Sequence, residues 1–421
     1  MGPENFPGLL FWIKREPAAD TMKKATEKGT VMQKIKVMHI LTDTNIGGAG
    51  TLLYNTMVCG DASRFDYVVV LPKGSRLIER FLPLSCRVVT VDCGQDRSIE
   101  WGALGEYIRV IREVRPDILH THAALTARLA GRLCRVPVCI QTRHCVFPLS
   151  SWQKNALFRL AFRIGSRLLS DRVIAVAEAA KENLLLLGMD ERQIEVIING
   201  VLPIRSCEQD EIEALRGAWG VDASHFVVGM PARLEEYKGQ ETVIRATALC
   251  RDTAPELRVL LIGDGSQEDR YRELAKKLDV EDRVMFTGFV SDMAPYYALM
   301  DLGVNASFGT ETSSLSLSEG MSAGVPALAS NYGGNPRMIN VGINGFLFPP
   351  RDEKALANLL LLLYRDRQLL EDLSKGARRL YSEKFTADAM VQQLEGLYER
   401  MMTRCQKKGG QLKHQPDFFA Q

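Results

Sequence analysis

The feature of this sequence that most constrains its fold is a repeated alternation of short apolar runs with amphipathic segments. From residue 35 onward, runs such as IKVMHIL, YVVVL, RVVTVD and DILHTH are separated by segments of helical periodicity. Nearly continuous apolar strands separated by helices are typical of a parallel sheet covered on both faces. The pattern continues through VCIQTRH, RVIAVAE and IEVIING, and therefore predicts an α/β fold for the first half of the chain.

The same alternation starts again after a more polar interval between residues 201 and 224, which we interpret as a linker with an entry helix. New strands are expected at FVVGMPA, RVLLIG, VMFTGF, LGVNAS and PALAS, whereas the sequence beyond residue 353 is helical only. Two consecutive α/β domains of similar size follow from this repetition. Ligands collect at the carboxyl ends of parallel strands, so two facing domains would form one binding cleft between them.

The domain prediction assigns every part of the chain. It comprises a disordered leader or start-site artefact (1–34), a first Rossmann-like domain (35–204), a second one (205–384), a helix returning to the first domain (385–403) and a mobile tail (404–421).

Charge and cysteine content exclude several classes of protein. Lys and Arg number 53 against 51 Asp and Glu, so the net charge of +2 gives no field that would gather nucleic acid. The nine cysteines form no Cys-x-x-Cys pair and are odd in number, as is usual for reduced thiols in a cytosol. The run LLFWI is too short for a signal peptide, and no apolar stretch is long enough to span a membrane. We therefore expect a cytoplasmic protein.

Glycine-rich and histidine-bearing segments follow strands of the first half. Gly48 lies in IGGAG, where a strand turns into a helix and backbone N–H groups are open to an anion. As a dinucleotide fingerprint the segment fails, because Leu53 stands where a third glycine is required; a plain tight turn is the alternative. His122 closes DILHTH, and Arg143 and His144 close VCIQTRH. This placement favours residues that line a site, although single histidines are often structural.

In the second half, PARLEEYKGQ follows a strand and supplies Arg233 and Lys238, a guanidinium and an ammonium suited to a pyrophosphate. The segment LLIGDGS adds Gly263 after the next strand, either as open backbone or as a simple turn. Neither signal is specific by itself.

The segment GTETSSLSLSEGMSAGVPALASNYGGNP carries two glutamates, Glu311 and Glu319, around the start of a helix near Ser314. The free N–H groups of Ser314 and Leu315 at that helix start would form a seat for an anion. Carboxylates that faced the anion would repel it, so we expect the two glutamates to bind sugar hydroxyls on either side of it. The NYGG turn is predicted to lie beneath this helix.

Taken together, these segments resemble glycosyltransferase family 4, whose architecture is GT-B, two facing Rossmann-like domains. The resemblance spans about residues 35 to 400 and rests on IGGAG, PDILHTH, RVIAVAEAAKENLLLLGMDERQIEVIINGV, ARLEEYKG, LLIGDGS, RVMFTGFVSDMAPYY, INGFLFPPRD and above all on the segment with Glu311 and Glu319. It implies a hexosyltransferase-type enzyme that uses a nucleoside diphosphate sugar, retains the anomeric configuration and needs no metal or cofactor. The absence of an Asp-x-Asp pair agrees with this implication.

The resemblance also implies roles for individual residues. Arg233 and Lys238 would bind the donor diphosphate, Glu319 the ribose and Glu311 the transferred sugar or its phosphate. The backbone of Val290 would help to seat the base, and His122 and Gly48 would lie opposite, near the acceptor, on the wall where Arg143 and His144 are expected. Polysaccharide or lipid-linked glycan assembly is the implied setting, with a glycan or lipid-linked acceptor.

Three positions depart from the family pattern. Thr312 replaces a usual glycine, Gly320 a usual alanine, and Arg337 a common glutamate. The first two would alter the shape of the sugar pocket, and the third suggests an acidic sugar. Three other functions stay open: a nucleotide-sugar epimerase, a phosphorylase, and a protein that binds nucleotide sugars without catalysis.

One segment bears on the acceptor. Residues 151–169 place Arg159, Arg163 and Arg167 four residues apart among apolar side chains. Such a basic amphipathic helix can lie on anionic lipid, at the inner face of the plasma membrane. The alternative is a helix packed on its own sheet with a solvated basic face.

Overall fold

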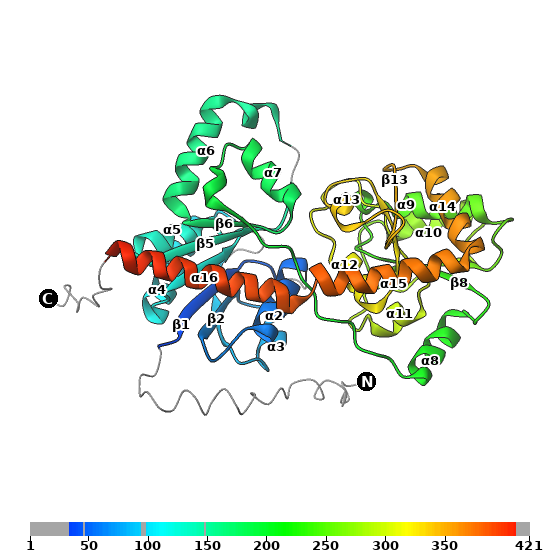
Figure 1. Cartoon of the computed structure of the whole chain (residues 1–421), viewed down its shortest axis with the longest axis horizontal. Coiled ribbons are helices and arrows are strands. Elements are labelled where there is room, and N and C mark those ends of the chain that lie inside the picture. The colour runs from blue at the N-terminus through cyan, green and yellow to red at the C-terminus, as the bar shows by residue number, and fades with distance from the viewer. Residues whose placement is uncertain (1–32, 45–46, 94–97, 147–148, 410–421) are drawn as a thin grey trace.

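The computed structural model describes residues 33–44, 47–93, 98–146 and 149–409, which form two α/β lobes side by side (Figure 1). The predicted leader, apart from residues 33 and 34, and the predicted tail beyond residue 409 lie outside the described residues. Each lobe is built on one sheet in which every strand pair is parallel, so the predicted α/β class is confirmed.

The first lobe contains a seven-stranded sheet in the order β3-β2-β1-β4-β5-β6-β7. Its strands are β1 (Ile35–Leu41), β2 (Phe65–Pro72), β3 (Arg87–Val91), β4 (Ile118–His122), β5 (Val138–Arg143), β6 (Arg172–Ala175) and β7 (Ile194–Val196). Successive side chains of a strand point to opposite faces, and both faces are buried here. In β1, Val37 and Leu41 enter one apolar cluster and Met38 and Ile40 the other, which explains why the strands read as continuous apolar runs.

Helices cover both faces of this sheet. They are α2 (Gly48–Cys59), α3 (Leu77–Phe81), α4 (Leu104–Val114), α5 (Leu125–Leu133), α6 (Ala156–Leu169) and α7 (Glu178–Leu186), with 3₁₀ turns η1 (Trp101–Ala103), η2 (Ser151–Lys154) and η3 (Glu191–Gln193). Side chains of α2 and α3 belong to one cluster and those of α4 and α5 to the other.

The second lobe contains a six-stranded sheet in the order β10-β9-β8-β11-β12-β13. Its strands are β8 (Phe226–Pro231), β9 (Leu257–Ile262), β10 (Val284–Phe286), β11 (Leu302–Asn305), β12 (Ala327–Ser330) and β13 (Gly345–Phe348). Its helices are α8 (Gln209–Trp219), η4 (Glu236–Lys238), α9 (Gln240–Cys250), α10 (Glu268–Lys277), α11 (Ala294–Leu299), α12 (Leu315–Ala323), α13 (Asn335–Met338), α14 (Glu353–Arg365) and α15 (Arg367–Lys384).

The chain passes between the lobes twice, and the two passages are hydrogen-bonded to each other. The N–H of Val201 donates to Phe385 O at 2.9 Å, and the N–H of Ala387 donates to Val201 O at 3.0 Å. A side chain at Gly200 would overlap the carbonyl of Thr386, so only glycine permits this approach. The two segments therefore form one narrow connection between the lobes.

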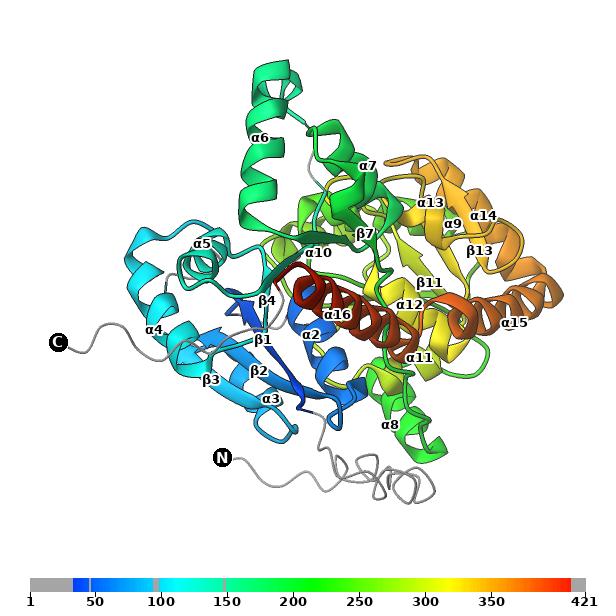
Figure 2. The same cartoon turned by 60° about the vertical axis from the view of Figure 1, so that its left-hand side comes forward.

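Helix α16 (Ala387–Gly409) returns to the first lobe and lies along its sheet (Figures 1 and 2). Its apolar residues recur every three or four positions and bury one face in the cluster that contains β1. That stripe consists of Met390, Val391, Leu394, Leu397, Tyr398, Met401 and Met402. The helix extends to Gly409, beyond the predicted end near residue 403.

Helix α6 stands away from the rest of the first lobe in both views (Figures 1 and 2). None of its side chains is buried, and Leu157 and Leu168 are 75% and 67% exposed. Instead, Arg163 Nε donates to Gly188 O at 3.1 Å, and Arg167 pairs with Asp190. The helix therefore does not pack on the sheet through a buried face, but its basic face is solvated as the alternative expected, because Arg159, Arg163 and Arg167 are all exposed. No helix among the described residues is long and apolar enough to cross a bilayer.

Candidate active site

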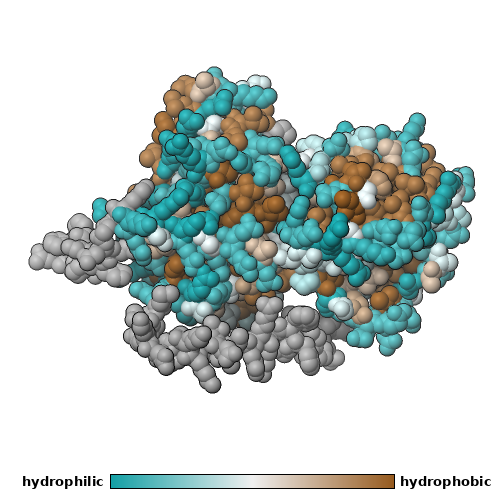
Figure 3. All heavy atoms as spheres, in the orientation of Figure 1, coloured by the Kyte–Doolittle hydropathy of each residue, from teal (hydrophilic) through white to brown (hydrophobic). Residues whose placement is uncertain are grey.

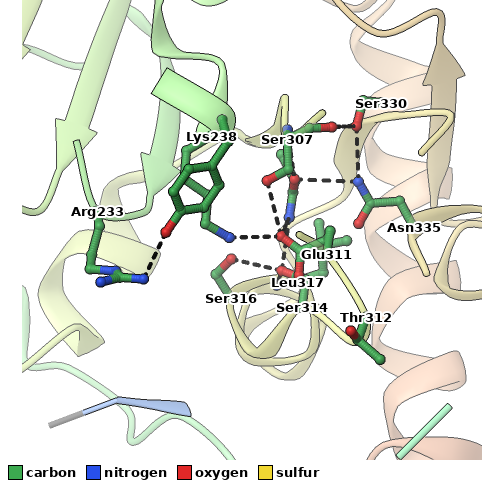
Figure 4. Close-up of polar contacts among 12 residues, drawn as sticks. Arg233, Lys238, Ser307, Glu311, Thr312, Ser314, Ser316, Leu317, Ser330 and Asn335 are labelled. Atoms are coloured by element: carbon green, nitrogen blue, oxygen red, sulfur yellow. Dashed lines mark hydrogen bonds and ion pairs between the residues drawn. The ribbon is translucent and has the colours of Figure 1, made fainter. Parts of the chain in front are cut away.

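The centre of the candidate site is the carboxylate of Glu311, in the loop after β11. This side chain is buried, and its Oε2 accepts hydrogen bonds from Lys238 Nζ at 3.0 Å, Ser307 Oγ at 3.0 Å and Asn305 Nδ2 at 3.3 Å. Figure 4 shows Lys238 and Glu311 pointing toward each other from different loops. A buried carboxylate with one cation and two neutral donors is well satisfied. Its orientation is therefore determined before any substrate binds.

The loop that carries Glu311 rests on the Gly-Gly turn predicted from NYGG. The N–H of Gly334 donates to Glu311 O at 3.0 Å, and Gly333 has a φ of 59°. A side chain at Gly333 would overlap the Glu311 carbonyl, and one at Gly334 would overlap the Thr312 carbonyl. The two glycines thus let the second backbone support the first at close range.

The cations of the loop after β8 are placed differently from each other. Lys238 ends η4, and the following Gly239, with a φ of 83°, packs so closely on Ala306 that a side chain would overlap its carbonyl. This contact brings Lys238 to Glu311. Arg233 is exposed, and its Nη2 donates to Tyr237 Oη at 2.7 Å (Figure 4). The guanidinium is therefore available at the edge of the site rather than inside it.

Helix α12 begins where the sequence predicted, with Ser314 as its N-cap. The Ser314 Oγ accepts from Leu317 N at 3.4 Å and from Asn305 Nδ2 at 2.9 Å. The first N–H groups of a helix have no intrahelical acceptor and carry the positive end of the helix dipole. The start of α12, at Leu315, is thus an electropositive surface beside the Glu311 cluster.

Glu319 lies further along α12 with separate partners. Its Oε2 accepts from Tyr297 Oη at 3.0 Å. Burial raises the pKa of Glu319 above its ordinary value, and the Tyr297 hydrogen bond and the charge of Arg80 from the first lobe act in the opposite direction. Glu311 and Glu319 therefore occupy two distinct environments, on either side of the α12 N-terminus.

Gly263 and Val290 lie in neighbouring loops at the carboxyl ends of β9 and β10. Gly263 has a φ of 139°, and its N–H donates to Gly288 O at 3.0 Å. Val290, two residues after Gly288, packs against the apolar cluster that contains Tyr297. Tyr297, the hydrogen-bond partner of Glu319, therefore lies in the same part of the second lobe as Gly263 and Val290.

The first lobe meets this site at two points. A Cβ at Gly48 would lie 3.5 Å from Leu315 Cδ1, so the N-terminal ends of α2 and α12 are adjacent. The N–H of Val146, just after β5, donates to Thr312 Oγ1 at 2.9 Å. Arg337 also contacts the first lobe, through an ion pair at 3.3 Å with Glu182. Thr312 and Arg337, two of the three positions that depart from the family pattern, therefore both link the lobes. The expected effects of these positions on the shape and charge of the sugar pocket stay predictions.

The histidines predicted to line the site form a hydrogen-bonded group. His122 Nδ1 lies 2.9 Å from His144 Nε2, and His122 Nε2 lies 3.2 Å from His39 Nδ1. His39 and Tyr398, which also joins this group, were missed by the sequence reasoning. The alternation of side chains along its strand could have pointed to His39. No signal in the sequence could have pointed to Tyr398, because it reaches the group from α16.

Burial keeps these imidazoles neutral. It lowers the pKa of His39 to about 3 and that of His144 to about 4, and lowers those of His120 and His122 well below the ordinary value. Only His144 is partly exposed. His122, with both ring nitrogens engaged, is thus enclosed within the first lobe.

Arg143 does not share the environment of His144. Alternation along β5 places it on the other face of the sheet, with Cys139 and with Gln141, which accepts from Arg128 of α5. Burial, and to a smaller extent the charge of Arg143, lowers the pKa of Arg128 to about 10. Arg143 therefore lies on the opposite face of β5 from Thr142, whereas His144, one residue beyond the end of the strand, is hydrogen-bonded to His122.

Comparisons with known proteins agree with this architecture. A family model described as "Glycosyltransferase Family 4" matches residues 46–203, and one described as "Glycosyl transferases group 1" matches residues 211–380. The putative glycosyltransferase EpsD of Bacillus subtilis is 29% identical over 303 residues, covering 70% of this chain and 79% of that protein.

Two further proteins match over more of the chain. The UDP-Gal:alpha-D-GlcNAc-diphosphoundecaprenol alpha-1,3-galactosyltransferase of Escherichia coli is 23% identical over 388 residues, covering 88% of this chain and 98% of that protein. The crystal structure of HepE from Anabaena in complex with UDP-glucose superposes with a TM-score of 0.73 at 23% identity, covering 87% of this chain and all of that one.

The fold, two lobes that each contain one parallel sheet, is that of a GT-B glycosyltransferase. The chain belongs to glycosyltransferase family 4 and is an enzyme that transfers a sugar.

Proposed function

We propose that the enzyme takes its sugar from a nucleoside diphosphate sugar, with uridine as the base, and transfers it to a hydroxyl of a glycan or lipid-linked acceptor. The observation that carries this proposal is the adjacency of an electropositive helix start, the Lys238–Glu311 pair and Glu319 in one lobe. The E. coli relative is named for UDP-galactose and the HepE structure contains UDP-glucose, and both support UDP as the nucleotide.

In this proposal the N–H groups at the start of α12 and the cations Arg233 and Lys238 stabilise the charge that develops on the departing diphosphate. Glu319 binds the ribose hydroxyls, and the backbone near Val290 and Gly263 contacts the base. Glu311 binds the transferred sugar with Oε1, because the donors that reach it within the described residues all meet Oε2. Protein cations supply the positive charge, so activity in EDTA should equal activity without it.

We further propose transfer with retention of configuration. The acceptor oxygen forms its bond to the anomeric carbon on the same face from which the bond to the phosphate oxygen breaks. The acceptor hydroxyl gives its proton to that departing oxygen, so no protein nucleophile is required. His144 and Gly48, on the first lobe, would orient the acceptor. NMR of the anomeric coupling constant in the product tests this step, and an inverted product would refute it.

The donor proposal is tested by thermal shift with UDP, GDP, ADP and dTDP. A ligand present at 100 times its Kd stabilises a folded protein by about 2.7 kcal/mol. UDP should give the largest increase in Tm, and in Glu319→Ala the same UDP concentration should stabilise the protein by about half as much or less. A larger shift with another nucleotide would refute the choice of base, and no shift with any of them would refute the donor class.

Product analysis separates transfer from the other GT-B reactions. An epimerase converts the sugar nucleotide without a second substrate, and a phosphorylase needs inorganic phosphate. We expect neither conversion, and slow release of free sugar at most, when the acceptor is absent.

A lipid-held acceptor is favoured by the outward face of α6. Its exposed apolar side chains lie three and four residues apart on one side, and Figure 3 shows apolar residues gathered on this arm. They are Leu157, Leu160, Ile164 and Leu168, with Trp152 just before the helix. Full burial of one such side chain is worth about 1.5–3 kcal/mol, so together they can hold the protein on a bilayer. The arginine row, in part held by the 188–190 turn, would contribute less.

Co-sedimentation with phosphatidylglycerol–phosphatidylcholine vesicles tests this contact. The double variant Leu160→Glu, Ile164→Glu should stay in the supernatant, while wild type sediments. The control is Leu249→Glu, an equally exposed leucine at the end of α9 in the other lobe. Equal sedimentation of the α6 variant and the wild type would exclude α6 as the membrane-binding face.

A further inference from the structure

Six side chains beneath the lobe junction form one continuous series of hydrogen bonds, which we call the histidine chain. His120 Nε2 lies 2.7 Å from Thr142 Oγ1 and His120 Nδ1 lies 2.6 Å from Tyr398 Oη. Tyr398 Oη lies 3.3 Å from His39 Nε2, and from His39 the series continues through His122 to His144. In order, the histidine chain is Thr142, His120, Tyr398, His39, His122 and His144.

Strand alternation assembles the histidine chain on one face of the first sheet. His39 is opposite His120 in the pairing of β1 with β4, and His122 is opposite Thr142 in the pairing of β4 with β5. Tyr398, fully buried on α16, closes the series from above that face. Its ring packs edge-on against both His39 and His120.

Each neutral imidazole has one N–H and one lone pair, and a phenol donates one hydrogen bond. With the Tyr398 phenol donating within the histidine chain, the hydrogen bonds can run in only two ways. If they run toward His144, every histidine carries its proton on Nδ1, and His144 Nδ1 is a donor. If they run toward Thr142, every histidine carries its proton on Nε2, and His144 Nδ1 is an acceptor. The tautomers of all four histidines are thus coupled.

The outer end of the histidine chain lies at the candidate site. His144 is the partly exposed member, and two residues later Val146 N–H donates to Thr312 beside Glu311. Hydrogen bonds that form a continuous series in a dry interior polarise one another. A group further inside the histidine chain can thus decide whether His144 offers a donor or an acceptor to a hydroxyl bound between the lobes.

We propose that Tyr398 is a positioning residue, which sets the tautomer of His144 through His39 and His122 and so orients the acceptor hydroxyl. The catalytic half of this inference rests on the proposed function, whereas the tautomer half stands on the contacts alone. The phenol does not touch the substrate. It links α16, the helix that follows the second crossing between the lobes, to the first-lobe wall of the site.

Binding of a metal ion would be an alternative function of the same imidazoles. Ligand nitrogens of His39, His120 and His122 lie within 4.8 Å of one another. Coordination by all three would require His120 to give up Tyr398 or Thr142, both of which lie within 2.7 Å of its nitrogens. The hydrogen-bonded arrangement uses every nitrogen of His39, His120 and His122, and is the one we adopt.

The test is Tyr398→Phe, which removes only the hydroxyl. The matched control is Tyr67→Phe: Tyr67 is also buried in this layer and also ties the sheet to α16, through Glu395 Oε1 at 2.8 Å, but it lies outside the histidine chain. Two-bond ¹H–¹⁵N spectra of the full chain without substrate report the tautomer of each histidine. We expect one shared tautomer in wild type and an altered population at His39, His122 and His144 in Tyr398→Phe only.

Activity is measured on the same variants. Tyr398→Phe should lower kcat about tenfold, the effect of one ordinary hydrogen bond, with the donor KM unchanged. If Tyr398→Phe does not fold, Thr142→Val removes the inner end of the histidine chain and should shift the same tautomers.

An unchanged His144 tautomer, an equal shift in Tyr67→Phe, or stoichiometric metal in the purified protein would overturn the inference. A shifted tautomer with unchanged kcat would overturn the catalytic role, and failure of sugar transfer in wild type would instead refute the proposed function.

Discussion

Replacement of Lys238 by alanine is the sharpest test of the candidate site. The ammonium lies 3.0 Å from Glu311 Oε2, and both side chains are largely buried. In the proposed reaction this cation also stabilises the departing diphosphate. Loss of one preorganised group of this kind typically lowers turnover by about 10² to 10³, and we expect kcat to fall by that factor.

The structure indicates how much stability the same change removes. Two unit charges 3.0 Å apart attract by roughly 5 kcal/mol at an effective dielectric constant of 20, but desolvation offsets much of this. Ser307 and Asn305 still donate to the carboxylate in the variant, so the net loss should be about 1–3 kcal/mol. Since domains are commonly stable by about 5–15 kcal/mol, the variant should fold, and lost activity would not reflect unfolding.

The assay compares turnover of the donor with the urea unfolding midpoint. The control is Arg245→Ala, which removes a cation paired with Glu241 on the exposed side of the neighbouring helix α9; both quantities should stay near wild type. The double variant Lys238→Met, Glu311→Gln removes the two charges together. It should regain stability relative to Lys238→Met alone, yet stay inactive.

Two results would refute this reasoning. If Lys238→Ala keeps half of the wild-type kcat, the ammonium does not act on the diphosphate. If the double variant regains activity together with stability, the pair has a structural role only.

Three further predictions follow from the same site and from the buried histidines. Glu319→Ala should weaken UDP binding by about 10- to 100-fold, the value of a hydrogen bond to a charged group; an unchanged Kd by calorimetry would contradict the ribose assignment. Gly334→Ala should lower both Tm and activity because the new methyl group overlaps the Thr312 carbonyl, whereas Gly217→Ala in α8, with open space around it, should raise Tm slightly. Burial lowers the pKa of His39 to about 3, whereas an unfolded histidine titrates near 6.5; the unfolded chain binds the proton first, so stability should fall as the pH drops from about 6.5 toward 3. Urea unfolding at pH 7.5 and 5.5 should differ by about 1 kcal/mol for each such histidine. Equal stabilities at the two pH values would show that the buried imidazoles titrate as they do in the unfolded chain, and would refute the lowered pKa.

Local patterns in the sequence determined the two α/β units, most strand positions and the start of α12 at Ser314. These features follow from periodicity, glycine placement and capping, which act over a few residues. The Glu311–Glu319 segment and the NYGG turn were located for the same reason, because their glycines and helix cap are contiguous in the chain.

Only the tertiary structure decided which partners these residues meet. Lys238 and Glu311 are 73 residues apart, and Tyr398 joins His39 across 359 residues. The outward apolar face of α6 was likewise hidden, because an amphipathic pattern shows that a helix has two faces but not which one the fold covers. Packing sets long-range partners through the summed contacts of whole helices and sheets, and no local stretch of sequence contains that sum.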